Sequence, residues 1–187
     1  MRVVLLFVAL SLCSACVPHN KPVANIQFSS VTSADKVYES LREVGGPIVI
    51  RNYTMHFTSN IEMLELFKKE DGTNPLVSAR LVCALEDDTN FSVKHNMQRY
   101  VEDGIKCGGL ERKSQGNVFN YISEFDFFET KDDGGSESRL EKQELNNMLS
   151  QKREIPCKVV ITVYLSTPYY SNAMYVPVKD ILREVNK

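Results

Sequence analysis

The sequence predicts a single α+β domain, in which three to four helices pack against a largely antiparallel sheet. Two stretches, Leu76–Leu85 and Pro156–Ser166, alternate apolar and polar residues as half-buried strands do. After Pro177, apolar residues recur at helical spacing, which predicts an amphipathic C-terminal helix. Helical patterns are interspersed with strands that short turns connect, an order typical of α+β folds. We find no internal repeat and no second domain boundary.

The first half of the body is predicted to alternate strands with helices. Thr32 or Ser33 can cap the first helix, and Gly45-Gly46 can end it. Ser59 and Glu62 have the spacing of a capping box, which predicts the start of a second helix. The expected elements are, in order, a strand at Ile26–Val31, a helix at Ala34–Val44, a strand at Pro47–Tyr53, a helix at Asn60–Lys69 and a strand at Leu76–Leu85.

The second half is predicted to contain more strands and two helices. Asn117–Thr130 has apolar residues at both odd and even positions, so both faces of this strand are apolar. We therefore expect it to be central in the sheet or covered on both faces. Ser138 and Glu141 again have capping spacing. The expected elements are strands at Phe91–Val101 and Asn117–Thr130, a helix from Ser138–Glu141 to Gln151, strands at Pro156–Ser166 and Tyr169–Val176, and a helix from Pro177.

The N-terminus has the layout of an export signal. Arg2 precedes an apolar run, Val3–Leu12, that ends in small residues and cysteine. As a helix this run would span roughly 15 Å, too short to cross a hydrocarbon core of about 30 Å. The segment therefore predicts export and cleavage, with residues 1–15 removed.

Ser14-Ala15-Cys16 resembles the lipobox of bacterial lipoproteins. The resemblance implies that Cys16 is diacylated at sulfur and becomes the new N-terminus. Cys13 does not fit this role, because Leu12 stands where the family has a small residue. With Val17 as the second mature residue, the resemblance further implies the outer membrane, facing the periplasm. The alternative is an ordinary secretory signal cut after Ala15.

The mature chain would be an acidic body on a tether. Loss of residues 1–15 leaves 172 of the 187 residues, and the net charge falls from −2 to −3 because Arg2 is removed. A weakly acidic body gives no reason to expect nucleic acid as a partner. Residues 16–25 include Pro18 and Pro22 and are predicted to form the tether, and residues 26–187 the domain.

Cysteine usage depends on the fate of Cys16. An exported protein folds in an oxidising compartment, so we expect at least one disulfide among Cys83, Cys107 and Cys157. We favour Cys83–Cys107, with Cys107–Cys157 as the second choice. Lipidation of Cys16 would leave one thiol unpaired, whereas an unmodified Cys16 would permit two disulfides.

No catalytic or metal-binding pattern is found. His19, His56 and His95 are far apart in sequence, and no nucleophile elbow or phosphate loop is present. We therefore expect no enzyme activity, no metal and no cofactor. Tyrosines near the C-terminus suggest a partner surface, because tyrosine is favoured at interfaces. The candidates are Tyr169, Tyr170 and Tyr175.

These observations together favour a lipid-anchored envelope protein with a non-catalytic structural, adaptor or binding role. Its partners would be the membrane, through the N-terminal lipid, and an envelope protein in a surface or periplasmic assembly. The alternative is a secreted, unanchored binding protein or effector that two disulfides stabilise.

Overall fold

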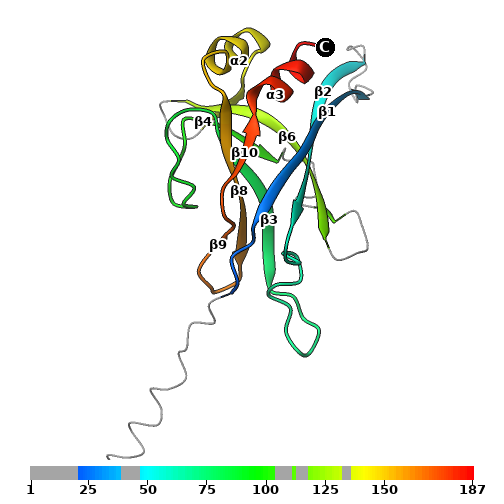
Figure 1. Ribbon diagram of the computed structural model, residues 1–187, viewed down its shortest axis with the longest axis vertical. Helices are drawn as coiled ribbons and strands as arrows, with labels where there is room; N and C mark the ends of the chain where they lie inside the picture. The colour runs from blue at the N-terminus through cyan, green and yellow to red at the C-terminus, as the bar shows by residue number, and fades with distance from the viewer. Residues whose placement is uncertain (1–20, 39–46, 104–110, 113–117, 132–135) are drawn as a thin grey trace, which may run out of the picture.

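The computed structural model describes residues 21–38, 47–103, 111–112, 118–131 and 136–187 (Figure 1). These residues form one antiparallel sheet and two short helices. The strands are β1 (Ile26–Tyr38), β2 (Ile48–Ser59), β3 (Leu76–Ala84), β4 (Arg99–Asp103), β5 (Glu111–Arg112), β6 (Phe119–Thr130), β7 (Glu137–Arg139), β8 (Glu154–Val163), β9 (Tyr169–Tyr170) and β10 (Met174–Pro177). The helices are α2 (Lys142–Leu149) and α3 (Val178–Val185).

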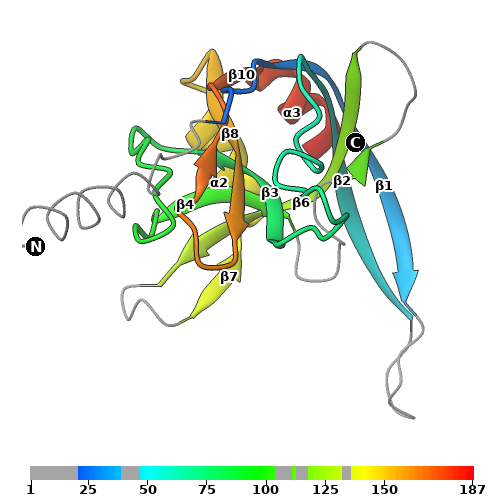
Figure 2. The ribbon, with the colours of Figure 1, turned by 90° about the horizontal axis from the view of Figure 1, so that it is seen from below.

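The sheet curls until its two ends approach each other (Figures 1 and 2). Its strand order is β1-β2-β6-β4-β3-β8-β10, with β5 and β7 also paired to β6 and β9 paired to β8. Near the two ends, Asn172 N donates a hydrogen bond to Ala24 O at 2.9 Å. Helix α3 contacts both β1 and β10, and Ser33 Oγ donates to the Glu184 carboxylate at 3.0 Å.

The main core fills the concave side of this curled sheet. Alternate residues of each strand point inward, as the two-residue period of a strand requires. Tyr53 and Phe127 pack edge to face, and Phe57 stacks on Tyr121. The helices close the core with their apolar faces, which contribute Leu145, Leu149, Ile181 and Val185.

A second, smaller apolar cluster covers the outer face of the sheet. It consists of Val82, Ala84, Phe91, Met97, Tyr100 and Val160, with Phe128 and Tyr170 packed against it. Phe91 and Met97 belong to the segment between β3 and β4, so this connection lies over the outer face of the strands. The middle of the sheet is therefore buried on both sides.

The expectation of an α+β fold with three to four helices is wrong, because the described residues form a largely β fold with two helices. The helix predicted at Ala34–Val44 is wrong for Ala34–Tyr38, because these residues form the end of strand β1. Cross-strand ion pairs favour the extended form there: Asp35 pairs with Arg51 and Lys36 with Glu124, each at 2.7 Å. The remaining residues of that prediction lie outside the described ones.

The predicted helix at Asn60–Lys69 is also replaced, here by a chain of turns. Ser59 Oγ accepts a hydrogen bond from Ile61 N at 3.2 Å instead of capping a helix. Met63 is fully buried, and its backbone N donates to Tyr121 Oη at 2.7 Å. Long-range contacts of this kind override the local capping signal.

Other predicted elements are confirmed with shifted ends. β3, β6 and β8 occupy the three strongest strand patterns, and β6 is central because it pairs with both β2 and β4. Helix α3 follows Pro177 as expected. Helix α2 begins at Lys142 with a capping box formed by Glu141 and Glu144, whereas Ser138 lies in β7.

In the described part of the chain, no helix is both long enough and apolar enough to span a membrane.

Candidate functional site

A pocket opens on the outer face of the sheet, between the strands and the segment that connects β3 to β4. Its volume is about 450 Å³, which is within the range of small-ligand sites. It is lined by Arg80, Val82, Phe91, Ser92, Val93, His95, Asn96, Met97, Tyr100, Glu102, Thr130, Glu137 and Val160.

The second apolar cluster supplies much of this lining. Val82 and Val160 come from β3 and β8, and Phe91 and Met97 come from the covering segment. Polar side chains of β3, β4 and β7 complete the lining, so an apolar surface stands beside charged and hydroxyl groups. Such a combination suits a ligand with an apolar body and a polar end.

Arg80 and Glu102 form an ion pair within the pocket lining. Glu102 is half-buried, and loss of solvent raises the pKa of its carboxyl, while the pairing with Arg80 opposes this rise. Arg80 Nε is buried and has no hydrogen-bond partner among the described residues. A buried donor without a partner is costly, so an acceptor placed near it would gain a strong hydrogen bond.

Tyr100 and Glu137 form the second polar pair. The Tyr100 hydroxyl donates to the exposed Glu137 carboxylate, and burial together with this hydrogen bond raises the pKa of Tyr100. Tyr100 therefore stays protonated at neutral pH and acts as a hydrogen-bond donor. With Arg80 already paired to Glu102, Glu137 leaves the lining with an excess of negative charge.

A series of local turns holds the covering segment in place. Asp88 Oδ1 accepts from Asn90 N at 3.1 Å, Asn90 Oδ1 accepts from Ser92 N at 3.2 Å, and Ser92 Oγ accepts from Lys94 N at 3.4 Å. Such side-chain to backbone bonds replace the bonds of a strand ladder. This is why the strand predicted at Phe91–Val101 is present only from Arg99 onward.

Several other polar groups of the pocket have partners within the protein. His95 pairs with Asp88, and Thr130 Oγ1 donates to Met97 O at 3.0 Å. Among the described residues, Ser92 Oγ accepts from the Lys94 backbone N–H, and the Thr130 hydroxyl is bonded to Met97 O and to the Tyr100 side chain. Across the described ranges, no group of three or more His, Cys, Asp and Glu side chains is placed to hold a metal ion.

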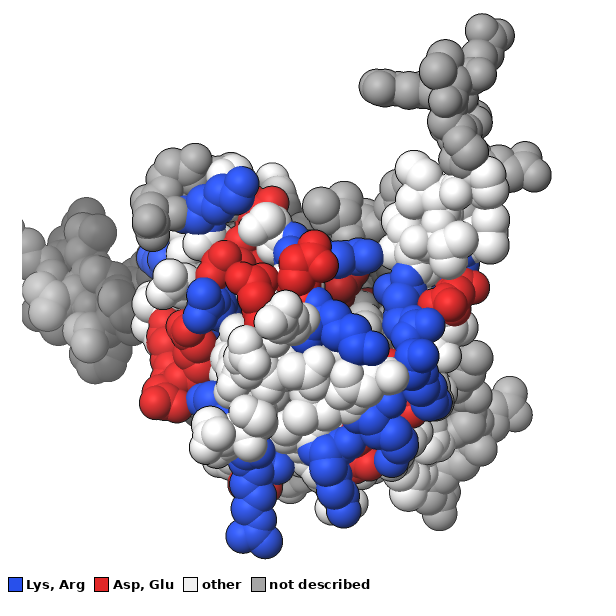
Figure 3. All heavy atoms as spheres, turned by 90° about the horizontal axis from the view of Figure 1, so that it is seen from above, with Lys and Arg blue, Asp and Glu red and all other residues white. Residues whose placement is uncertain are grey.

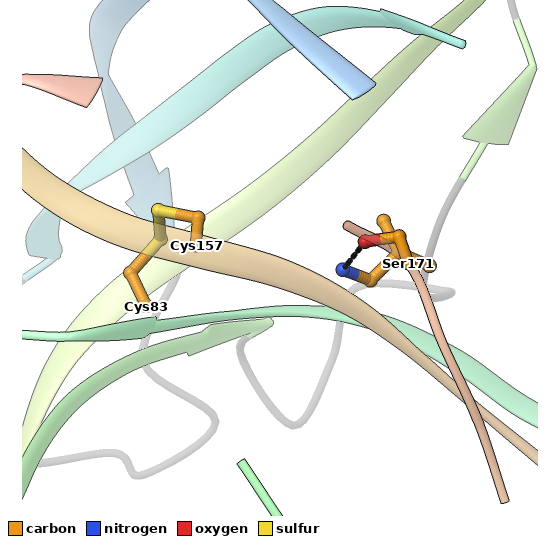
Figure 4. Close-up of a disulfide and its surroundings, with 4 residues drawn as sticks. Cys83, Cys157 and Ser171 are labelled. Atoms are coloured by element: carbon orange, nitrogen blue, oxygen red, sulfur yellow. Dashed lines mark hydrogen bonds between the residues drawn. A yellow bond between two sulfur atoms is a disulfide. The ribbon is translucent and has the colours of Figure 1, made fainter. Parts of the chain in front are cut away.

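The cysteine pairing differs from the prediction. Cys83 and Cys157 are directly opposite each other in the β3–β8 ladder and form a disulfide, and both are fully buried (Figure 4). The favoured Cys83–Cys107 pair and the second choice, Cys107–Cys157, are therefore wrong. Both cysteines lie among the alternate apolar residues of the two strongest strand patterns. Two such cysteines on one buried face of a sheet are candidates for a disulfide, so this pattern could have predicted the pair. Cys16 and Cys107 lie outside the described residues.

The three candidate interface tyrosines do not share one surface. Tyr169 is buried in the main core, and Tyr170 packs against the second apolar cluster. Neighbouring residues of a strand point to opposite faces, which separates these two side chains. Tyr175 alone is largely exposed, on β10.

The sequence gives no signal for the pocket, because its charged residues Arg80, Glu102 and Glu137 come from three different strands. Arg80 and Glu102 are twenty-two positions apart, and only the pairing of β3 with β4 brings them together. No protein-family model, curated protein or solved structure matches this chain. Its function is therefore inferred from the site itself.

Proposed function

We propose that this chain is a lipid-anchored protein of the cell envelope that binds a small amphipathic ligand in the outer-face pocket. The pocket carries this proposal, because its apolar residues stand beside unsatisfied and charged polar groups. Of the structural, adaptor and binding roles that the sequence suggests, binding has a site of suitable volume and chemistry. The anchor is proposed at Cys16, in the outer membrane facing the periplasm.

The lining favours a peptide-like amine as the ligand. Phe91, Met97 and Val160 offer contact to an apolar group. Glu137 would attract a cationic amine, and Arg80, whose Nε has no partner among the described residues, would donate a hydrogen bond to a carbonyl oxygen. An anionic ligand would meet two carboxylates for one guanidinium and should bind less well.

Binding can be tested with three aromatic probes that differ in charge: phenylalaninamide, N-acetylphenylalaninamide and N-acetylphenylalanine. We expect the cationic probe to bind most tightly and to shift the methyl NMR signals of Val82, Met97 and Val160. Glu137→Gln should weaken the cationic probe severalfold and leave the neutral one unchanged. Glu154→Gln, an exposed carboxylate outside the pocket, is the matched control. Equal binding of all three probes, or shifts elsewhere, would contradict the proposal.

The anchor can be tested by the intact mass of the mature protein and a count of its thiols. Lipidation predicts acyl mass on Cys16 and one free thiol, Cys107, beside the Cys83–Cys157 disulfide. The alternative is a secreted binding protein whose unmodified Cys16 pairs with Cys107. That alternative predicts an unmodified N-terminus and no free thiol.

A further inference from the structure

Three chain segments meet at the end of the molecule where the described chain begins, which is the lower end in Figure 1. Lys21 Nζ lies 5.5 Å from the centre of the Phe67 ring, and Phe67 packs edge to face on Tyr169. Tyr164 N donates to Pro75 O at 3.0 Å. The N-terminal residues, the turns before β3 and the β8–β9 connection thus form one end of the molecule, which we call the basal end.

The basal end exposes an apolar tip. Tyr164 is 70% exposed, Leu165 is 90% exposed and Val77, beside them at the start of β3, is 64% exposed. Scattered apolar residues are normal on a surface, but here Tyr164 and Leu165 are consecutive and both are largely exposed.

The backbone at this tip is also strained. Leu165 has φ 53°, in the left-handed region that costs an L-residue with a side chain roughly 1 kcal/mol or more. Ser166 N donates to Val163 O at 3.3 Å, so Leu165 occupies a turn position that normally holds glycine or asparagine. A polar or glycine residue would suit both the turn and the solvent better, which indicates that the leucine side chain has a use.

The opposite end has a different surface. Figure 3 shows Lys, Arg, Asp and Glu side chains of both signs over the end that carries α2 and α3. Among them, Arg183 pairs with Asp180 and Lys187 with Glu184. These charged pairs distinguish the α2–α3 end from the apolar tip of the basal end.

The length of chain before Lys21 limits how far the basal end can be from the anchor. Four residues lie between Cys16 and Lys21, so five Cα–Cα steps join them, and a fully extended chain gains at most about 3.6 Å per step. Residues 22–25 are themselves held to the body, because Tyr169 Oη donates to Pro22 O and Asn25 N donates to Asn60 Oδ1. Lys21 would therefore lie within roughly 18 Å of an acylated Cys16.

We propose that the basal tip, formed by Tyr164, Leu165 and Val77, inserts into the lipid surface that holds the anchor. This inference rests on the proposed lipidation of Cys16. Tyrosine favours the headgroup level of a bilayer, and leucine the boundary of the acyl chains. The contact would orient the body with the end that carries α2 and α3 away from the membrane.

The chain contains no tryptophan, so a single introduced tryptophan reports its own surroundings. We would prepare Leu165→Trp and Tyr164→Trp in the full acylated chain, in phosphatidylcholine vesicles with brominated acyl chains. Val49→Trp is the matched control, since Val49 is 59% exposed on β2 near the other end of the β1–β2 hairpin. We expect both tip variants to show blue-shifted emission and severalfold stronger quenching than the control.

The outcomes separate this inference from the function on which it rests. If the protein does not float with the vesicles, the anchor and the tip contact both fail. If it floats but the tip tryptophans are quenched no more than Val49→Trp, the anchor stands and the tip contact is overturned. The use of two tip variants guards against one of them disturbing the turn.

Discussion

The hydroxyl of Tyr169 accepts a hydrogen bond from Ala24 N at 2.6 Å and donates another to Pro22 O at 3.0 Å. One buried side chain of β9 thus holds the N-terminal segment against the basal end. Part of the stretch that the sequence suggests as a tether is therefore attached to the body, and its length available for movement is correspondingly smaller. This attachment limits how far an anchor at Cys16 could lie from the basal end of the fold.

Tyr169→Phe should release this segment. The substitution leaves the buried Ala24 N–H without an acceptor, and we expect the free energy of unfolding to fall by about 1–3 kcal/mol. Hydrogen exchange at the Ala24 amide should accelerate before global unfolding. Tyr164→Phe, at an exposed position, should change stability by less than about 0.5 kcal/mol. Unchanged exchange at Ala24 would show that other contacts hold the segment.

Removal of the disulfide should destabilise the fold. Cys83 and Cys157 are 74 positions apart, and the cross-link restricts a large loop in the unfolded chain. We expect the double variant Cys83→Ala/Cys157→Ala to lose about 2–4 kcal/mol in urea denaturation. A reductant should destabilise the parent chain and leave the double variant unaffected. Cys107→Ser should retain the parent stability, and a loss similar to that of the double variant would refute this pairing.

Glu184 should make stability dependent on pH in the acid range. Its burial alone would raise its pKa, but hydrogen bonds from Lys187, Ser33 and Arg183 lower it below the ordinary value of 4.5. A carboxyl with a lowered folded-state pKa contributes stability above its unfolded pKa, and that contribution is lost as the pH falls through the folded-state pKa.

We therefore expect Glu184→Gln to cost about 1–2 kcal/mol at pH 7, because charge-assisted hydrogen bonds are lost. The difference from the parent chain should shrink as the pH falls below about 4.5, measured by denaturation at each pH. Glu70→Gln, at an exposed position, provides the comparison. A difference that is independent of pH would show that the loss comes from packing and not from charge.

Leu165→Asn should stabilise the protein. Asparagine tolerates the left-handed backbone of this turn better than leucine, so we expect a gain of up to about 1 kcal/mol. Leu165→Ala removes the same apolar side chain but keeps the backbone strain, and should give no gain. If both variants behave alike in thermal denaturation, the turn is not strained. If Leu165→Asn stabilises the fold but weakens the contact with vesicles, Leu165 serves membrane contact at the expense of stability.

Local sequence signals predicted those elements that tertiary contacts did not contradict. β3 and β8 follow from alternation, and α3 follows from Pro177 and its apolar spacing. The helix predicted at Ala34–Val44 is wrong over Ala34–Tyr38, because these residues pair with β2 along the β1–β2 ladder. A capping signal is worth about 1 kcal/mol, which a long strand ladder readily exceeds.

The candidate site was the least predictable part. Arg80, Glu102 and Glu137 have no motif spacing, and their meeting depends on which strands are neighbours in the sheet. The turns formed by Asp88, Asn90 and Ser92 were visible as residue types typical of loops. Their effect, which is to lay Phe91 and Met97 over the outer face, required the folded structure.

The sequence by itself determined the apolar parity of the main strands, the terminal helix and the features of the N-terminus that predict export and an anchor. These depend on residues near one another in the chain, where spacing alone sets which side chains share a face. Only the tertiary structure decided the curled β fold, the Cys83–Cys157 pair, the pocket and the meeting of the N-terminal segment with the β8–β9 connection at one end. Each of these depends on the order and register of the strands. Order and register are set when residues distant in sequence pack into a common core.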